Sequence, residues 1–246
     1  MPRFEASALR GYCVSVLTAS GVERSCAEAV ADALIDAELT GVSTHGVSRL
    51  AVYMQRMDAG VMSRENNIRI VRESTSTLVV DAGNSLGAAA AKFAMERCIA
   101  KAKETGCCFA SVHSSNHFGT AAYYTRLAAA QDMIGFACTN LKGKIAPFGS
   151  AEPYMGTNPI SVAAPSDDLP VVLDMAPSVV ALGKLILAQK LEKSIPEGWA
   201  LRFRRPLFRL SSRASIFSRT AGSWPYGSLR AERPTTIRMR SMPSRA

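Results

Sequence analysis

The sequence predicts an α/β protein in which helices alternate with short strands, and part of the strand pairing is expected to be parallel. Apolar residues recur at intervals of three and four along the N-terminal region, which is the period of a helix that faces a core. Beyond residue 66 the pattern changes to short β-branched runs that alternate with Ala-rich stretches. A hydrophobic content of 48% is typical of a chain that buries a core.

The N-terminal region, residues 1–65, is predicted to be helical. Its apolar spacing marks helices over 6–17, 27–39 and 44–60. Ser25 and Thr44 are expected to be the N-caps of the second and third helices, because a hydroxyl at that position accepts hydrogen bonds from free backbone N–H groups.

Residues 66–201 are predicted to form the α/β region. Short apolar runs mark strands at 68–71, 77–81, 107–112, 133–139, 160–164 and 171–175, and helical stretches lie at 88–103, 121–130 and 179–190. A polar loop, 113–119, joins one strand to the next helix. Loops of this kind are where α/β sheets place their ligands.

The last segment, residues 202–246, differs from the rest of the chain in composition. It holds eleven arginines, one glutamate, no lysine and no aspartate. Its formal charge is therefore +10, and since the whole chain has a net charge of +9, residues 1–201 have a net charge of −1. It shows no sustained period, and we expect an irregular tail. A basic arm that contacts nucleic acid, an ordinary solvated tail and an out-of-frame product are three interpretations; the absence of lysine and aspartate favours the third.

Several classes of protein are not expected. No run of about eighteen apolar residues occurs, so no membrane span is predicted. The N-terminus has an early charge and no apolar core of the kind a secretory signal needs. The six cysteines contain no CxxC pair and are typical of reduced thiols in a cytoplasmic protein.

His45 and Arg49 are the first candidates for chemistry. They lie four residues apart at the expected start of a helix, so both side chains can face one side, where the helix N-terminus favours an anion. A guanidinium can hold a carboxylate while an imidazole moves the proton of a neighbouring carbonyl or hydroxyl. The alternative is that Thr44 caps the helix and His45 is an ordinary surface residue.

His117 is the second candidate, because it lies in the polar loop between a strand end and a helix start. The alternative is a turn whose polar residues only satisfy backbone groups. His113 and His117 have HxxxH spacing, but they span a strand end and a loop rather than one helix, so no metal site is expected. The GxGxxG, GxxxxGK[ST] and GxSxG motifs are all absent from the sequence.

Five short motifs resemble, in order and spacing, those of the type-2 malate/L-lactate dehydrogenase family, which includes ureidoglycolate and sulfolactate dehydrogenases. The motifs are STHGVSRL at 43–50, SNHFG at 115–119, APFG at 146–149, GTNP at 156–159 and LDMA at 173–176. Each is weak alone, whereas five in register are specific. The resemblance runs from about residue 4 to residue 201.

The resemblance implies a cytoplasmic, homodimeric, NAD- or NADP-dependent oxidoreductase. It interconverts a small 2-hydroxy acid and a 2-oxo acid of the malate, lactate or ureidoglycolate type, on a mixed sheet that is not a Rossmann fold. Residues 66–201 would then bind cofactor and substrate. The residues that this implication marks are His117 and His45 for proton transfer, Arg49, Ser43, Thr157 and Asn158 for the substrate, and Asp174, Met175, Ala176 and Lys142 for the cofactor.

Two departures from the family pattern qualify this hypothesis. After the Thr-Asn pair at 139–140 the family usually has a small or polar residue, whereas this chain has Leu141 and then Lys142. Lys142 either meets a cofactor phosphate or faces solvent. The match also breaks after Leu201, which suggests a truncated or frameshifted member. We therefore expect weak cofactor binding and impaired activity. The alternative function is a non-catalytic binding protein whose Arg-rich tail contacts nucleic acid, although nucleic acid is the less expected partner.

Overall fold

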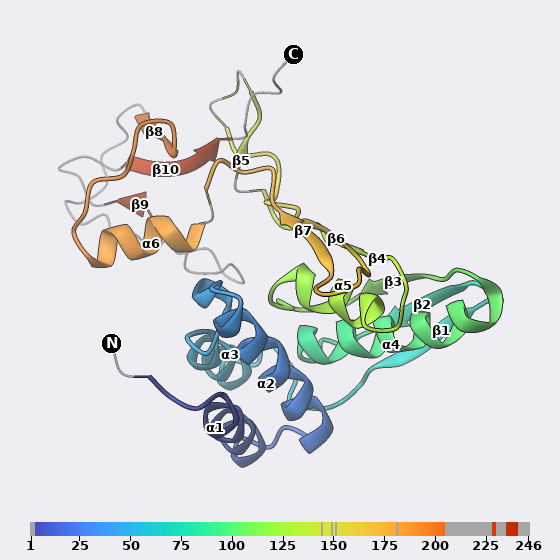
Figure 1. Cartoon of the computed structure of the whole chain (residues 1–246). Helices are drawn as coiled ribbons and strands as arrows, with labels where there is room; N and C mark the ends of the chain where they lie inside the picture. Colours follow the sequence, from blue (N-terminus) through green and yellow to red (C-terminus); the bar gives the residue numbers. More distant parts are fainter. Residues whose placement is uncertain are drawn as a thin grey trace. The chain divides into compact units, whose positions relative to one another are not determined.

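A computed structural model describes residues 3–143, 145–148, 150, 152–180, 182–204, 228–229 and 235–240 (Figure 1). The chain divides into two compact units, which are described separately below. The first comprises Met1–Ala137 and Ile160–Asp174, and the second comprises Cys138–Pro159 and Met175–Ala246. These two units are defined by contacts between residues. The predicted division of the sequence into regions 1–65, 66–201 and 202–246 is a different one and stays a prediction.

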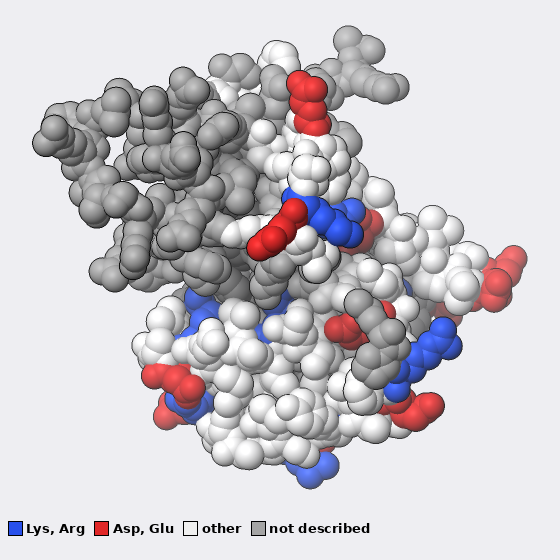
Figure 2. Space-filling model, turned by 90° about the vertical axis from the view of Figure 1, so that its left-hand side faces the viewer, with Lys and Arg blue, Asp and Glu red and all other residues white. Residues whose placement is uncertain are grey.

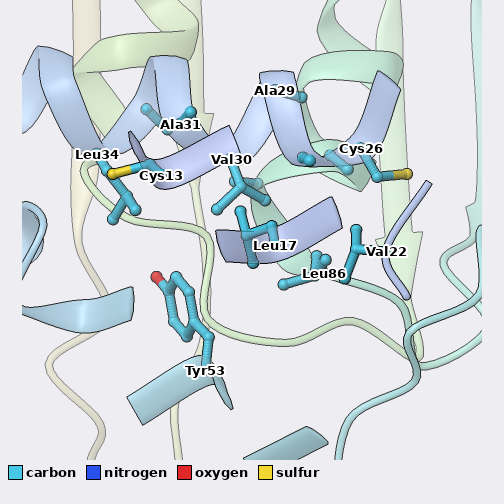
Figure 3. Packing of buried hydrophobic residues seen from close by; sticks show 14 of the residues in the cluster. Cys13, Leu17, Val22, Cys26, Ala29, Val30, Ala31, Leu34, Tyr53 and Leu86 are labelled. Carbon is cyan, nitrogen blue, oxygen red and sulfur yellow. The ribbon is translucent and has the colours of Figure 1, made fainter. Parts of the chain in front are cut away.

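The predicted helices of the N-terminal region are present as α1 (Ala6–Ala19), α2 (Arg24–Leu39) and α3 (Arg49–Asp58). Their apolar faces meet in one core with the start of α4 (Gly87–Thr105). Figure 3 shows Leu17, Val30 and Leu34 directed toward this interior. Many of the buried residues of α2 are alanines, which allow neighbouring helices to approach closely.

The two predicted helix caps are wrong. Arg24 is already helical, so Ser25 lies inside α2, where its hydroxyl donates to the Glu23 carboxylate at 2.5 Å. Residues Ser43–His45 form a separate 3₁₀ turn, η1, and α3 begins only at Arg49 after Ser48. The Thr44 hydroxyl lies 3.0 Å from Nδ1 of His45 instead of capping a helix.

A mixed sheet of three strands follows these helices, which confirms the predicted α/β class. Its order is β1 (Arg69–Glu73), β2 (Thr77–Asp81), β3 (Phe109–His113). The β1–β2 pair is antiparallel and the β2–β3 pair is parallel. α4 connects the two parallel strands, as a parallel pair requires, and packs on Leu78 and Val80 of β2.

A second sheet of three strands has the order β4 (Gly135–Cys138), β6 (Ile160–Ala164), β7 (Val171–Met175). α5 (Ala121–Ala129) packs on β6. The Thr125 and Ser161 hydroxyls, both fully buried, bond to each other at 2.9 Å across this contact. Buried hydroxyls need such partners, so the pair fixes α5 on the strand.

The second unit contains β5 (Ile145–Ala146), α6 (Leu182–Lys190), β8 (Ala200–Arg204), β9 (Ser228–Leu229) and β10 (Thr235–Arg240). β10 pairs in parallel with β5 and antiparallel with β8 and β9. The described part of the predicted irregular tail therefore has strand backbone, and its other positions lie outside the described residues. A small apolar cluster forms around Ile145, Val180 and Leu185. Within the described ranges, every helix is too short or too polar to traverse a lipid bilayer.

Candidate active site

The ends of the parallel strands β2 and β3 place two loops side by side. Because the strands are parallel, their carboxyl ends lie at one edge of the sheet. The loop after β2 leads into α4, and the loop after β3 carries His117 toward α5. The backbone N–H of Asn84 in the first loop donates to the carbonyl of Ser114 in the second at 2.8 Å. His117 therefore lies on a loop that is fixed to its neighbour.

One face of α3 is directed at this loop. Arg49, Tyr53 and Arg56 are spaced by four and three residues, which places them on the same side of the helix. The Tyr53 hydroxyl lies 2.7 Å from Nδ1 of His117, and Tyr53 is only 2% exposed. Nη2 of Arg56 donates to Oδ1 of Asn116, the residue before His117, at 3.2 Å. The helix thus holds both the ring and the backbone next to it.

His45 stacks on His117. The two ring centroids are 5.4 Å apart and the ring planes differ by 20°. Nε of Arg49 donates to the carbonyl of Thr44 at 2.5 Å, which anchors the guanidinium beside the turn that carries His45. The three residues that the sequence singled out for proton transfer and carboxylate binding therefore meet at one place in the first unit.

Both imidazoles are strongly biased toward the neutral form. The pKa of His117 falls to about 3. Burial is the largest cause, followed by the positive charges of His45, Arg49 and Arg56. The pKa of His45 falls to about 4, because of burial first and the charge of Arg49 second. Two stacked rings beside guanidinium groups cannot both hold protons easily. At neutral pH the site therefore offers two uncharged imidazoles next to fixed positive charge.

Such an arrangement suits an anionic ligand that exchanges a proton. The guanidinium can form charge-assisted hydrogen bonds to a carboxylate. A neutral imidazole can accept a proton from a hydroxyl near that carboxylate. Perturbed pKa values at a cluster of convergent polar groups are typical of functional sites.

Sequence reasoning missed Tyr53, Arg56 and Asn116. The spacing from Arg49 to Tyr53 and Arg56 was a usable signal, since it places all three on one helical face. The contact between α3 and the loop after β3 joins residues about sixty positions apart, with separations of 64 for Tyr53–His117 and 60 for Arg56–Asn116. No local pattern could have supplied these partners.

Asp174 is also in the first unit, at the end of β7. Its Oδ2 accepts a hydrogen bond from the backbone N–H of Ala122 at 3.3 Å, in the first turn of α5. Burial raises the pKa of Asp174, although that hydrogen bond and the charge of Arg126 oppose the rise. One carboxylate oxygen is thus used to connect β7 with α5. Ser43 is exposed at the start of η1.

The remaining predicted site residues belong to the second unit. Oδ1 of Asn158 accepts a hydrogen bond from the backbone N–H of Leu141 at 3.0 Å, which ties the segment of Lys142 to that of Thr157. Lys142 is exposed and Met175 is 51% exposed, whereas Ala176 and Thr157 are partly buried. The structure thus gathers His45, Arg49 and His117 in the first unit. The other predicted residues of this paragraph belong to the second unit.

In the part of the chain that the structure describes, no group of three or more His, Cys, Asp or Glu side chains could hold a metal ion. Figure 2 shows acidic and basic side chains close to one another on one face of the molecule. Among the residues coloured there, side chains of both signs are interspersed.

Comparison with known proteins agrees with this chemistry. A family profile described as malate/L-lactate dehydrogenase matches residues 4–203. A relative named malate dehydrogenase from Pyrococcus horikoshii is 43% identical over 193 residues, which cover 78% of this chain and 54% of the relative. The solved structure of malate dehydrogenase from Pyrococcus horikoshii OT3 superimposes with a TM-score of 0.73 at 42% identity, covering 75% of this chain and 53% of that one.

Two further relatives differ in the cofactor that their names carry. A (2R)-3-sulfolactate dehydrogenase (NADP(+)) from Chromohalobacter salexigens is 39% identical over 189 residues, covering 76% of this chain and 56% of its own length. A ureidoglycolate dehydrogenase (NAD(+)) from Escherichia coli K12 is 34% identical over 186 residues, with coverage of 75% and 53%. The chain therefore spans about half the length of the curated relatives it matches.

Proposed function

The chain belongs to the malate/L-lactate dehydrogenase family, and on that premise we propose that it is an NAD(P)-dependent oxidoreductase. Its reaction interconverts a small 2-hydroxy acid and the corresponding 2-oxo acid, of the malate, lactate or ureidoglycolate type. The observation that carries this proposal is the stacked pair of neutral imidazoles beside the Arg49 guanidinium.

Arg49 binds the substrate carboxylate, and the hydroxyl on the next carbon then points at the histidine pair. In the tautomer whose Nδ1–H donates to the Tyr53 oxygen, Nε2 of His117 presents its lone pair to that hydroxyl. His117 accepts the hydroxyl proton as the alcohol carbon is oxidised. A ring already neutral at pH 7 needs no prior loss of a proton for this step.

Substrate binding itself prepares the reverse reaction. A bound carboxylate offsets the charge of Arg49, which is one of the causes that lower the pKa of both histidines. The pKa of each ring therefore rises when the anion binds, so that part of the bound chain carries one proton on the pair while the rest stays neutral. A protonated His117 can then donate to the carbonyl oxygen of a 2-oxo acid. The pair holds one proton rather than two, because two charged rings at this separation would repel each other.

A nicotinamide dinucleotide supplies or accepts the hydride when it is bound. The available residues fit such a group in chemistry: Met175 offers exposed apolar surface, and Lys142 offers an exposed cation for a phosphate. We assign Asp174, Met175, Ala176 and Lys142 to cofactor contacts, and Ser43, Thr157 and Asn158 to the polar surroundings of the substrate. The relatives' names include both NAD(+) and NADP(+), so the proposal covers both.

The proposal extends to a homodimer in the cytoplasm. The three relatives described above are all dehydrogenases by name, which favours the oxidoreductase over the alternative of a nucleic-acid-binding protein with an Arg-rich tail. Light scattering on the purified chain should give twice the mass of 26.3 kDa. A mass equal to one chain at micromolar concentration would contradict the dimer.

The decisive experiment follows oxidation of NADH and of NADPH by the 246-residue chain with oxaloacetate, pyruvate and 3-sulfopyruvate. We expect slow but measurable turnover with at least one acid, together with weak cofactor binding by calorimetry. His117→Gln should lower the rate by a factor of about 100 or more, as expected for a lost proton-transfer group.

The matched control is His113→Gln, since His113 is an exposed histidine at the end of β3. It should leave the rate within about twofold of the parent chain. No oxidation of either cofactor by the parent chain, or equal losses in the two variants, would overturn the proposed activity.

A further inference from the structure

The side-chain amide of Asn116 makes more hydrogen bonds than a residue in a simple turn needs. Its Nδ2 donates to the Asn84 carbonyl at 2.9 Å, to Asn84 Oδ1 at 2.9 Å and to the Ser85 carbonyl at 3.0 Å. Its Oδ1 accepts from Nη2 of Arg56 at 3.2 Å. One amide therefore joins the loop after β2, the loop after β3 and helix α3.

The backbone around Asn116 is built to keep this arrangement. Asn84 and Ser114 have φ of +60° and +51°, in the left-handed region that costs free energy for residues other than glycine. The Asn84 N–H donates to the Ser114 carbonyl at 2.8 Å, which joins these two positions. Strain of this kind persists only where surrounding contacts over-determine the conformation.

Gly87, the first residue of α4, allows the same loop to pass close to the helix. A Cβ at position 87 would lie 2.1 Å from the Asn116 carbonyl oxygen and 2.6 Å from that of His117. Both atoms are backbone, so neither can swing aside as a side chain would. The absence of a side chain at this position therefore sets how deeply His117 lies in the site.

We propose that Asn116 is the positioning residue of His117. It fixes the loop so that the His117 ring stays stacked on His45 and bonded to Tyr53, and it does so without touching the reacting atoms. This inference rests on the proposed function for its catalytic meaning, but the positioning is a property of the chain alone. Loss of the clamp should let the ring move toward water and change its protonation.

The test uses ¹⁵N-histidine NMR, because the chain has only three histidines. In the parent chain, His117 should stay neutral from about pH 8 down to about pH 5, with a single tautomer set by Tyr53. In Asn116→Ala, we expect His117 to begin protonating above about pH 5, a rise of at least tenfold in its proton affinity, and its tautomers to mix.

Asn66→Ala is the matched control. Asn66 is exposed and its amide donates to a carboxylate oxygen of Glu23 at 3.0 Å, far along the sequence from the site. This change should leave the resonances of His45 and His117 in place. If Asn116→Ala fails to fold, Asn84→Gly removes one acceptor of the clamp while accepting the positive φ, and should shift His117 in the same direction by less.

The outcomes separate the two proposals. Unchanged His117 titration and tautomer in folded Asn116→Ala and Asn84→Gly would overturn the positioning role, whatever the chain catalyses. A clear shift in His117 in a chain that oxidises neither NADH nor NADPH would support the positioning role and remove the proposed activity.

Discussion

The two units of the chain differ in how their interiors are built. In the first, about twenty buried residues from α1, α2, α3, α4 and α5 form one continuous core, and the histidine pair lies against it through Tyr53. Among the described residues of the second, the apolar cluster is centred on only Ile145, Val180 and Leu185. The residues proposed for proton transfer are thus supported by a large core, whereas Lys142, Met175 and Ala176 belong to the unit whose described core is much smaller.

Replacing one buried leucine by alanine in each core should give the largest change in stability. Leu17→Ala in the first unit should lower the free energy of unfolding by about 3 kcal/mol, because Leu17 is fully buried. Leu185→Ala should leave the first unit unchanged. In chains that also carry Trp224→Phe, the fluorescence of Trp199 in urea reports the second unit, while the helical circular dichroism reports mainly the first. Coincident shifts of both signals in both variants would show a single cooperative unit.

Each unit also contains a glycine that another backbone segment approaches closely. A Cβ on Gly87 would meet the Asn116 carbonyl oxygen at 2.1 Å, and one on Gly156 would meet the Leu141 carbonyl oxygen at 2.3 Å. Gly87→Ala should cost about 2 kcal/mol in the helical unfolding transition, since the strain enters the large core. Gly156→Ala should disturb only the tryptophan signal. An unaltered helical transition in Gly87→Ala would contradict the close packing of the His117 loop on α4.

The pH dependence of stability should belong to the first unit, because all three histidines lie there. The pKa values of His117, about 3, and His45, about 4, are below the ordinary 6.5, so the unfolded chain binds protons first as the pH falls. Stability should therefore decrease below about pH 6.5, by roughly 1 kcal/mol per pH unit for each ring. Urea titrations should show a flatter profile for the double variant His45→Gln/His117→Gln. A profile for the double variant as steep as that of the parent chain would refute the neutral, half-buried pair.

The smallest expected effect comes from ion pairs within the first unit. Asp32 accepts from Arg10 at 2.6 Å and from Lys92 at 3.0 Å, which links α1, α2 and α4. Asp32→Asn should reduce the free energy of unfolding by about 1 kcal/mol, because these side chains are only partly buried. Glu28→Gln, which breaks an exposed pair with Arg24 inside α2, should change it by less than about 0.5 kcal/mol. Equal effects would mean that the Asp32 network adds nothing to the core.

The sequence predicted elements well where a local pattern determines them. The strands Thr77–Asp81, Ile160–Ala164 and Val171–Met175 have the predicted bounds, because β-branched runs flanked by turn residues define both ends. The cap at Thr44 was wrong, because the 3₁₀ turn and the Ser48 position delay the start of α3. Strand β10 had no local signal at all, and its backbone pairs with segments far away in sequence.

The site could be predicted only in part, for the same reason. Motif resemblance selected His45, Arg49 and His117, and the structure brings them together. Tyr53 and Asn116 were not selected, because their roles arise from contacts across more than sixty and thirty residues that no local pattern encodes. The low pKa values likewise depend on burial and neighbouring charge, which the sequence does not display.

The central claim is that Arg49 and the two histidines act as one site in which binding an anion and taking up a proton are coupled. Calorimetric titration with oxamate, a carboxylate analogue of a 2-oxo acid, in two buffers of different ionisation enthalpy measures this directly. At about pH 6 we predict net proton uptake by the parent chain, and none by Arg49→Gln, whose affinity should fall about tenfold or more. Oxamate binding of equal affinity in both chains, without proton uptake, would contradict the account.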